Sequence, residues 1–166
     1  MTFGDIPAAE MVFLDANVFI HYFVRDPDLS PPARDLLRRI ESGELRGVTT
    51  THILAEVLHR LMTIEAMQTL GWSYAGIAQR LRQHPDAIEK LHVFQDCVRE
   101  ISDSPVAIHE VTLANLSDAT GISAAEGLLT NDAIVVAVMR ELGLNLIASE
   151  DTDFDRVAEL QRFSAK

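Results

Sequence analysis

Acidic side chains interrupt the apolar segments of this chain at several places. Asp15 directly follows the apolar run MVFL, Glu56 and Asp132 lie within the helical patterns ILAEVLHRLM and TNDAIVVAVM, and a group of acids, EDTDFD, follows LNLIAS. A carboxylate among buried apolar residues carries a desolvation cost unless it is paired, protonated or bound to a cation. Oxygen ligands with few histidines nearby favour Mg²⁺ or Mn²⁺ over zinc. The pattern therefore predicts a divalent-cation site, which typically serves phosphate chemistry.

Each of these acids, taken singly, also has a structural explanation. Glu56 has Arg60 one helical turn later, at the spacing of an ion pair. Asp132 could be an acid of a first helical turn, where the helix dipole favours negative charge, and Asp15 could cap the helix that follows it. Together the acids are harder to explain in this way, because carboxylates that converge repel one another unless they are protonated or bind cations.

Short apolar runs that alternate with helical patterns indicate how the acids are positioned. The expected strands are MVFL, RGVTTT, PVAIHEV and LNLIAS. Helices are expected over ANVFIHYFVRD, over a segment that Ser30 caps and Gly43 ends, over residues 52–70, over TLANLSDATGI, and over LLTNDAIVVAVMRELG with Thr130 as its cap. This alternation predicts an α/β fold with a parallel sheet, in which the strand ends that carry Asp15 and EDTDFD meet at one edge.

Length and composition bound the possibilities. The 166 residues, 48% of them hydrophobic, predict a single domain (residues 1–166) with a helical insertion at about 71–104, which either lids the site or forms an oligomer interface. No apolar run approaches the ~20 residues of a membrane span, no secretory signal is visible, and the lone cysteine suits a reducing cytoplasm. The net charge of −11 argues against general affinity for nucleic acid, unless bound cations or a basic partner offset it.

Other kinds of site fit the sequence poorly. DTDFD resembles the start of a calcium loop, but Arg156 and Arg162 stand where glycine and the bidentate glutamate belong. His52 and His59 form only a weak zinc pair. A dehalogenase-like phosphatase requires a second acid where Asn17 stands, and no G-x-G-x-x-G follows any strand, which argues against a nucleotide-binding oxidoreductase.

Four segments resemble a known family in their order and spacing. FLDANVFI, THILAEVLHR, LLTNDAIVVAVM and LIASEDTDF are similar to motifs of the PIN-domain nucleases, and most similar to those of the VapC-type toxins of prokaryotic toxin–antitoxin pairs. The resemblance implies a PIN-like (Rossmann-like) three-layer α/β sandwich with a central parallel sheet flanked by helices. It also implies an endoribonuclease that depends on Mg²⁺ or Mn²⁺, hydrolyses RNA phosphodiester bonds and binds a small cognate antitoxin.

The same resemblance implies roles for particular residues. Asp15, Glu56 and Asp132 match the first three acids of the family, and Asp151 is favoured over Asp153 as the fourth. The expected metal ligands are Asp15, Asp132 and Asp151, with Glu56 and Asp153 as further candidates. Ser149 stands where the family often has threonine, a departure that keeps a hydroxyl group. The expected auxiliary polar residues are Asn17, Thr130 and Ser149.

RNA contacts and protein partners complete the expectation. Basic residues of the first third of the chain are expected to border the substrate groove, Arg38 and Arg39 above all, together with Arg25, Arg34 and Arg46. The apolar residues around Leu36 and Leu37 would then form a binding surface for an antitoxin helix. We also expect a homodimer. The alternative is a catalytically degenerate PIN domain that acts as a protein-interaction module.

Overall fold

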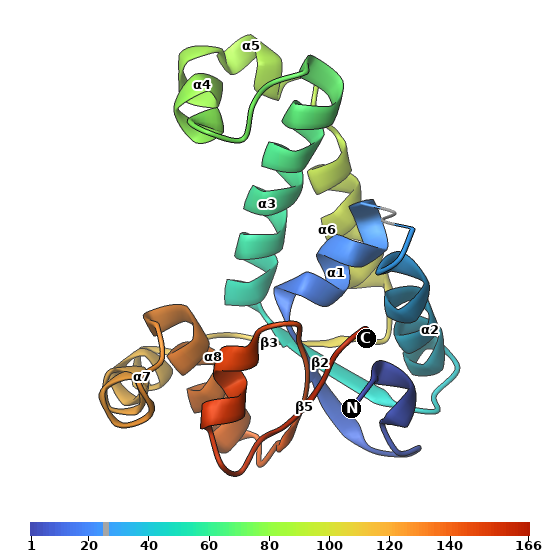
Figure 1. Cartoon of the computed structure of the whole chain (residues 1–166), viewed down its shortest axis with the longest axis vertical. Helices are drawn as coiled ribbons and strands as arrows, with labels where there is room; N and C mark the ends of the chain where they lie inside the picture. The colour runs from blue at the N-terminus through green and yellow to red at the C-terminus, as the bar shows by residue number, and fades with distance from the viewer. Residues whose placement is uncertain (25–26) are drawn as a thin grey trace.

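A parallel β-sheet lies at the centre of the computed structural model, which describes residues 1–24 and 27–166 (Figure 1). Within these residues, five strands pair in the order β3-β2-β1-β4-β5, and every pair is parallel. The strands are β1 (Met11–Leu14), β2 (Arg46–Thr50), β3 (Ala107–His109), β4 (Leu146–Ala148) and β5 (Gln161–Phe163). The predicted α/β fold with a parallel sheet is confirmed.

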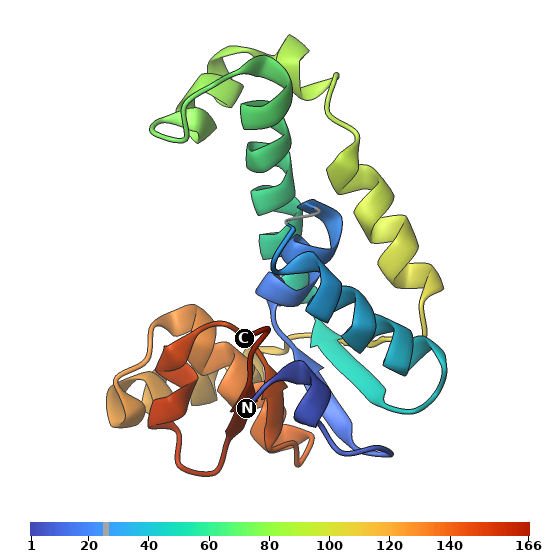
Figure 2. The same ribbon diagram turned by 45° about the vertical axis from the view of Figure 1, so that its right-hand side comes forward.

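Helices cover both faces of this sheet and complete the three layers. On one side α1, α2, α3 and α6 pack together, whereas α7 pairs with α8 on the other (Figure 1, Figure 2). The α-helices are α1 (Ala16–Val24), α2 (Ser30–Glu41), α3 (Thr51–Leu70), α4 (Ile77–Gln83), α5 (Pro85–Ile88), α6 (Val93–Asp103), α7 (Leu113–Glu126) and α8 (Thr130–Glu141). Two 3₁₀ helices, η1 (Phe3–Asp5) and η2 (Thr152–Arg156), lie near the chain ends.

The core lies between the central strands and the helices that cover them. Phe13 and Leu14 of β1 and Ile147 of β4 are fully buried. Residues 133–139 of α8 are all buried as well, which explains why this helix is apolar on every side. In the described ranges, no single helix is long and apolar enough to cross a membrane, and α7 and α8 meet that test only as a pair bent by 112°.

Two helix starts differ from the prediction. Ser30 is the first residue of α2 rather than its cap, and its hydroxyl donates to the His21 carbonyl oxygen at 2.5 Å, which ties α2 to α1. Thr130 is likewise the first residue of α8, after Leu129. Thr50, the last residue of β2, caps α3 through a 3.2 Å bond from an amide of the first turn. A polar residue marks the neighbourhood of a helix start, but the backbone conformation decides which position is the cap.

The fifth strand is also absent from the prediction. β5 has only three residues, and it pairs with β4 so that Ala148 lies beside Phe163. Phe163 is buried, whereas Gln161 is exposed and Arg162 is half-buried. Three residues are too few for an alternating pattern to be recognised. The long-range pairing with β4 creates this strand, and it brings Arg162 next to the acids described below.

α3 extends well beyond the sheet and carries a further group of helices at its far end (Figure 1). Gly71 ends α3 with a φ of +65°, in the left-handed conformation that favours glycine. Beyond it, α4, α5 and α6 account for the largely helical segment expected at 71–104. A second hydrophobic cluster forms there, separate from the main core, and its buried members are Ala66, Ile77, Leu81 and Leu91.

Candidate active site at the carboxyl ends of the central strands

The register of β1 and β4 brings Asp15 and Ser149 together. Leu14 lies beside Ala148, so the next residue of each strand reaches the carboxyl edge of the sheet. The Ser149 hydroxyl donates to one oxygen of Asp15 at 2.6 Å. The other oxygen accepts from the Ala16 amide at 2.7 Å, and the Asn17 side chain donates to the first at 3.2 Å. These bonds hold the Asp15 carboxylate in one orientation.

Asp15 is a charged group in a place that disfavours charge. Only 8% of the residue is exposed. Burial raises the pKa of Asp15 above its ordinary value, the bonds from Ser149 and Ala16 oppose that rise, and the negative charges of Glu56 and Asp151 add to it. A bond to its immediate neighbour Ala16 is not that of a helix cap, which binds an amide two or three residues later. The capping explanation is therefore insufficient for Asp15.

A tight turn after β4 positions Asp151. The Ser149 hydroxyl, itself bonded to Asp15, accepts from the Asp151 amide at 3.0 Å. Asp151 then caps η2 by accepting from the Asp153 amide at 2.8 Å. Asp153 forms an ion pair with Arg156 at 2.9 Å. One serine therefore joins the two strand ends. Of the two candidates for the fourth acid, Asp151 is bonded directly to this serine, whereas the Asp153 carboxylate pairs with Arg156.

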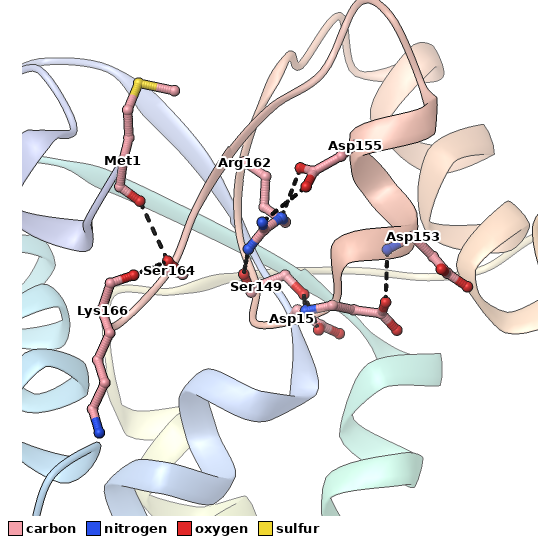
Figure 3. A network of polar contacts seen from close by, with 9 residues as sticks. Met1, Asp15, Ser149, Asp153, Asp155, Arg162, Ser164 and Lys166 are labelled. Atoms are coloured by element: carbon pink, nitrogen blue, oxygen red, sulfur yellow. Dashed lines mark hydrogen bonds and ion pairs between the residues drawn. The ribbon is translucent and has the colours of Figure 1, made fainter.

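Arg162 of β5 stabilises the turn after β4 (Figure 3). Its guanidinium group makes two parallel bonds to the Asp155 carboxylate, at 2.8 and 2.9 Å. It also donates to the Ser149 carbonyl oxygen at 3.1 Å. The Arg162 side chain is 16% exposed and that of Asp155 is 54% exposed, so the paired bonds are geometrically specific but partly screened by solvent. In the sequence, Arg162 only argues against a calcium loop, and no local pattern predicts this supporting role.

Asp132 and Glu56 bring further negative charge to the same place from two helices. Asp132 lies in the first turn of α8, and Glu56 near the start of α3. Burial first, and then the charges of Asp151, Asp15, Asp153 and Glu56 in that order, together raise the pKa of Asp132 to about 6. Acids from four parts of the chain therefore lie near enough for their charges to act on Asp15 and Asp132. Mutual repulsion of this kind is typical of sites that bind cations.

The ion pair expected of Glu56 is present but weak. An Arg60 nitrogen lies 3.9 Å from a Glu56 oxygen, at the limit of an ion pair, and the two side chains are 49% and 32% exposed. Exposed pairs of this kind contribute between about 0 and 1 kcal/mol to stability. The pair with Arg60 alone does not account for an acid that also raises the pKa values of Asp15 and Asp132.

Comparison with known proteins identifies the family to which this fold belongs. The family profile of the PIN domain matches residues 12–160. The chain belongs to the PIN domain family. No curated protein sequence matches this PIN domain. Solved structures do, at low sequence identity, and they show its fold.

Three of these structures illustrate the likeness. VapC20 of Mycobacterium tuberculosis, described as a toxin that cleaves the sarcin–ricin loop, is 16% identical with a TM-score of 0.60, over 89% of this PIN domain and 95% of that chain. VapBC2 of Rickettsia felis, bound to a DNA fragment of its promoter, is 10% identical with a TM-score of 0.59, over 93% and 98%. DNA-bound VapBC of Salmonella typhimurium is 12% identical with a TM-score of 0.57, over 95% and 99%.

The donor atoms of this PIN domain suit a hard cation in kind. Asp15, Asp132, Asp151 and Glu56 offer only oxygen, which Mg²⁺ and Mn²⁺ prefer. In the part of the chain that the structure describes, however, no three His, Cys, Asp or Glu side chains lie close enough together to hold an ion as they stand. Asp15 is held by its hydrogen bonds, so Asp132 and Asp151 would have to turn toward it to share an ion.

The remaining predicted polar residue is less engaged. Thr130 is exposed at the first position of α8, two residues before Asp132. Asn17, by contrast, contacts Asp15 directly. The structure therefore brings Asn17 and Ser149 to Asp15, and places Thr130 at the start of the helix that carries Asp132.

Arg38 and Arg39 are not brought to the acids. Both lie in the last turn of α2, which returns the chain to the start of β2, at the opposite edge of the sheet from Asp15. Arg39 is bonded within the protein, to Glu44 at 2.7 Å and to two carbonyl oxygens of residues 3 and 6, and is 17% exposed. Arg38 is 73% exposed and pairs with Asp35. Arg25 lies outside the described residues. The expected substrate groove along this end of α2 is therefore not supported.

Proposed function

We propose that this PIN domain is a Mg²⁺- or Mn²⁺-dependent endoribonuclease that hydrolyses RNA phosphodiester bonds and serves as the toxin of a toxin–antitoxin pair. The observation that carries the proposal is that Asp15 is buried and Asp132 half-buried at the carboxyl edge of the sheet, where the charges of neighbouring acids raise the pKa values of both. A free-standing structural role gives no reason for such a concentration of charge, whereas a cation would neutralise it.

The residues of the site would divide the work as follows. Asp15, Asp132 and Asp151 would hold one or two divalent ions, with Glu56 or Asp153 completing the ligand set directly or through water. When bound, the ion supplies a Lewis acid for the phosphoryl oxygen and an activated water. Ser149 orients Asp15 through its hydroxyl and Asp151 through the same oxygen. Because the metal stabilises the charge that develops on the phosphate, no nucleophilic side chain is required.

The toxin role and the partners rest on the structural neighbours. VapBC complexes share the fold, and one neighbour is described as an RNA-cleaving toxin. By analogy, we infer a small cognate antitoxin and a homodimer. Expression of the wild-type chain without a partner should then arrest growth, and Asp15→Asn should relieve the arrest. Harmless expression of active protein would contradict the toxin role and leave the nuclease role untouched.

A catalytically degenerate PIN domain that binds other proteins is the second candidate. The observation in its favour is that no three acids of the described residues converge on an ion position. The two candidates differ in metal affinity, because a degenerate site would not bind Mn²⁺. Isothermal titration of the purified chain with Mn²⁺ separates them: binding that Asp15→Asn abolishes supports the nuclease, and no binding by wild type supports the protein-interaction module.

Cleavage of RNA is the direct test. Wild-type protein should cleave a structured cellular RNA with Mg²⁺ or Mn²⁺ and stop on addition of EDTA. Asp15→Asn should lose most of this activity and remain folded by circular dichroism. Asp118→Asn is a matched control, because Asp118 is exposed in α7 and outside the site. Cleavage that persists in EDTA, or full activity of Asp15→Asn, would refute the assignment.

A further inference from the structure

The far end of α3 carries aromatic and basic side chains that the acid site does not use. We define the arm tip as residues 71–92, which include α4 and α5. Trp72 packs against the second hydrophobic cluster and leaves part of its ring in solvent. The Arg80 guanidinium carbon lies 5.2 Å from the centre of that ring, and the His84 ring lies 5.7 Å away. Tyr74 is 70% exposed, and it is the aromatic residue among the large hydrophobic side chains that lie exposed in the described part of the chain.

The charge of the arm tip differs from that of the whole chain. It holds three basic and two acidic residues, whereas the chain has a formal charge of −11. Lys90 and Asp86 offset each other as an exposed pair at 4.0 Å. Arg80 and Arg82 are both exposed. Exposed aromatic rings beside arginine side chains are the combination that stacks nucleobases and neutralises phosphates in proteins that bind single-stranded nucleic acid.

The periodicity of α3 places the arm tip on the same side as the acids. One face of α3 carries four residues at helical spacing, with intervals of four, seven and three positions: Glu56, Arg60, Met67 and Leu70. Met67 and Leu70 pack against the second hydrophobic cluster. In both views α4 lies on the same side of α3 as α7 and α8, the pair that carries Asp132 (Figure 1, Figure 2).

The distance between the arm tip and the acid site sets the minimum length of a ligand that contacts both. Glu56 and Leu70 are fourteen residues apart on α3, which is about 21 Å at a rise of 1.5 Å per residue. Arg60 lies on this path, one turn beyond Glu56, and its side chain is 49% exposed. A ligand that contacts both ends must therefore extend over several nucleotides along α3.

We propose that the arm tip is a second RNA-contacting surface, on which Trp72 and Tyr74 stack unpaired bases and Arg80 and Arg82 contact phosphates. The inference rests on the proposed ribonuclease function. It adds that a stretch of unpaired RNA is held at the arm tip while the bond to be cut lies at the acids. Such a grip also explains how a chain of charge −11 retains RNA.

Trp72 is itself the reporter for a test, because the chain contains a single tryptophan. The probe is a short RNA stem-loop, titrated into full-length wild-type protein in EDTA so that it stays intact. Binding should quench the emission of Trp72. The double variant Arg80→Gln/Arg82→Gln should bind severalfold more weakly, and the slope of log K against log[KCl] should fall by about 1.4 for the two lost phosphate contacts. Arg38→Gln, an exposed arginine far from the tip, is the matched control and should behave as wild type.

The outcomes separate the alternatives. Arg82→Gln alone keeps the test valid if the loss of Arg80 disturbs the Trp72 ring. No quenching, or an unchanged affinity and salt slope in both variants, overturns the proposal. The arm tip could instead be a contact between two copies of the chain. In that case the emission of Trp72 would change with protein concentration in the absence of RNA, and the double variant would elute as a smaller species on size exclusion. This result would also overturn the proposal. RNA cleavage without a Trp72 response removes this inference alone, whereas quenching without cleavage removes the proposed nuclease and leaves an RNA-binding tip.

Discussion

Replacing Asp132 by asparagine should stabilise the metal-free protein. The substitution keeps the size of the side chain and removes its charge. Burial, and then the charges of Asp151, Asp15, Asp153 and Glu56, raise the pKa of Asp132 from 3.8 to about 6. The folded protein therefore holds a proton that the unfolded chain releases between these two pH values, so wild-type stability falls as the pH rises from about 4 to about 6. Asp132→Asn has no such proton to lose.

The size of the effect follows from the pKa and from the position of the side chain. At about 1.4 kcal/mol per pH unit, a rise from 3.8 to about 6 corresponds to about 3 kcal/mol. Because Asp132 is only half-buried, solvent screening reduces this to about 1–1.5 kcal/mol. The lost attraction between an acid and the start of α8 subtracts about 0.3–1 kcal/mol. The net gain is between about 0 and 1.2 kcal/mol, or up to about 5 °C in Tm for a chain of this length.

Thermal unfolding in EDTA, followed by circular dichroism from pH 4 to pH 7.5, measures this gain. The difference between variant and wild type should be absent near pH 4 and complete above pH 6, with Asp118→Asn unchanged throughout. Added Mg²⁺ should reverse the order, because an ion at a hundred times its Kd stabilises wild type by about 2.7 kcal/mol and the variant less. A variant that melts below wild type in EDTA at neutral pH would refute the repulsion and make Asp132 an ordinary first-turn acid.

Three further predictions concern individual side chains. Asp15→Asn should lower RNA cleavage by at least about 100-fold, since loss of a ligand should exceed the 10- to 100-fold effect of a supporting residue, and a single-turnover assay measures it. Arg162→Gln should lower kcat by about 10-fold by releasing the turn that carries Asp151. It should cost about 0.5–1.5 kcal/mol in urea unfolding, because the Ser149 carbonyl loses its donor while water hydrates the exposed Asp155 carboxylate. Arg162→Lys should restore part of the activity, and equal kcat in all three proteins would show that the clamp is irrelevant to the site. Ser149→Ala should weaken Mn²⁺ binding by about 10- to 100-fold in calorimetry, and unchanged affinity would show that its bonds to Asp15 and Asp151 do not orient ligands.

The sequence by itself determined the order of the first four strands and of the main helices between them, and the places where acids interrupt them. Short apolar runs and helical spacing are local properties, so the strand before Asp15 and the helix around Glu56 could be predicted from their own residues. The meeting of Asp15 with the turn after β4 also follows, because parallel strands bring their carboxyl ends to one edge. The resemblance to PIN-domain nucleases added the pairing of these acids with Asp132.

Only the tertiary structure decided which side chains support or surround those acids. Arg162 belongs to a three-residue strand that exists through its pairing with β4, and its bonds to Asp155 and Ser149 bring together residues that no local pattern relates. The same holds for Arg39, which the packing of α2 commits to carbonyl oxygens of the N-terminal segment rather than to RNA. The periodicity of apolar residues indicates which face of a helix or strand is buried. It does not indicate where the connection after that element leads the chain in the fold. In the folded chain, Arg38 and Arg39 lie away from the acids, and Arg80 and Arg82 lie at the far end of α3.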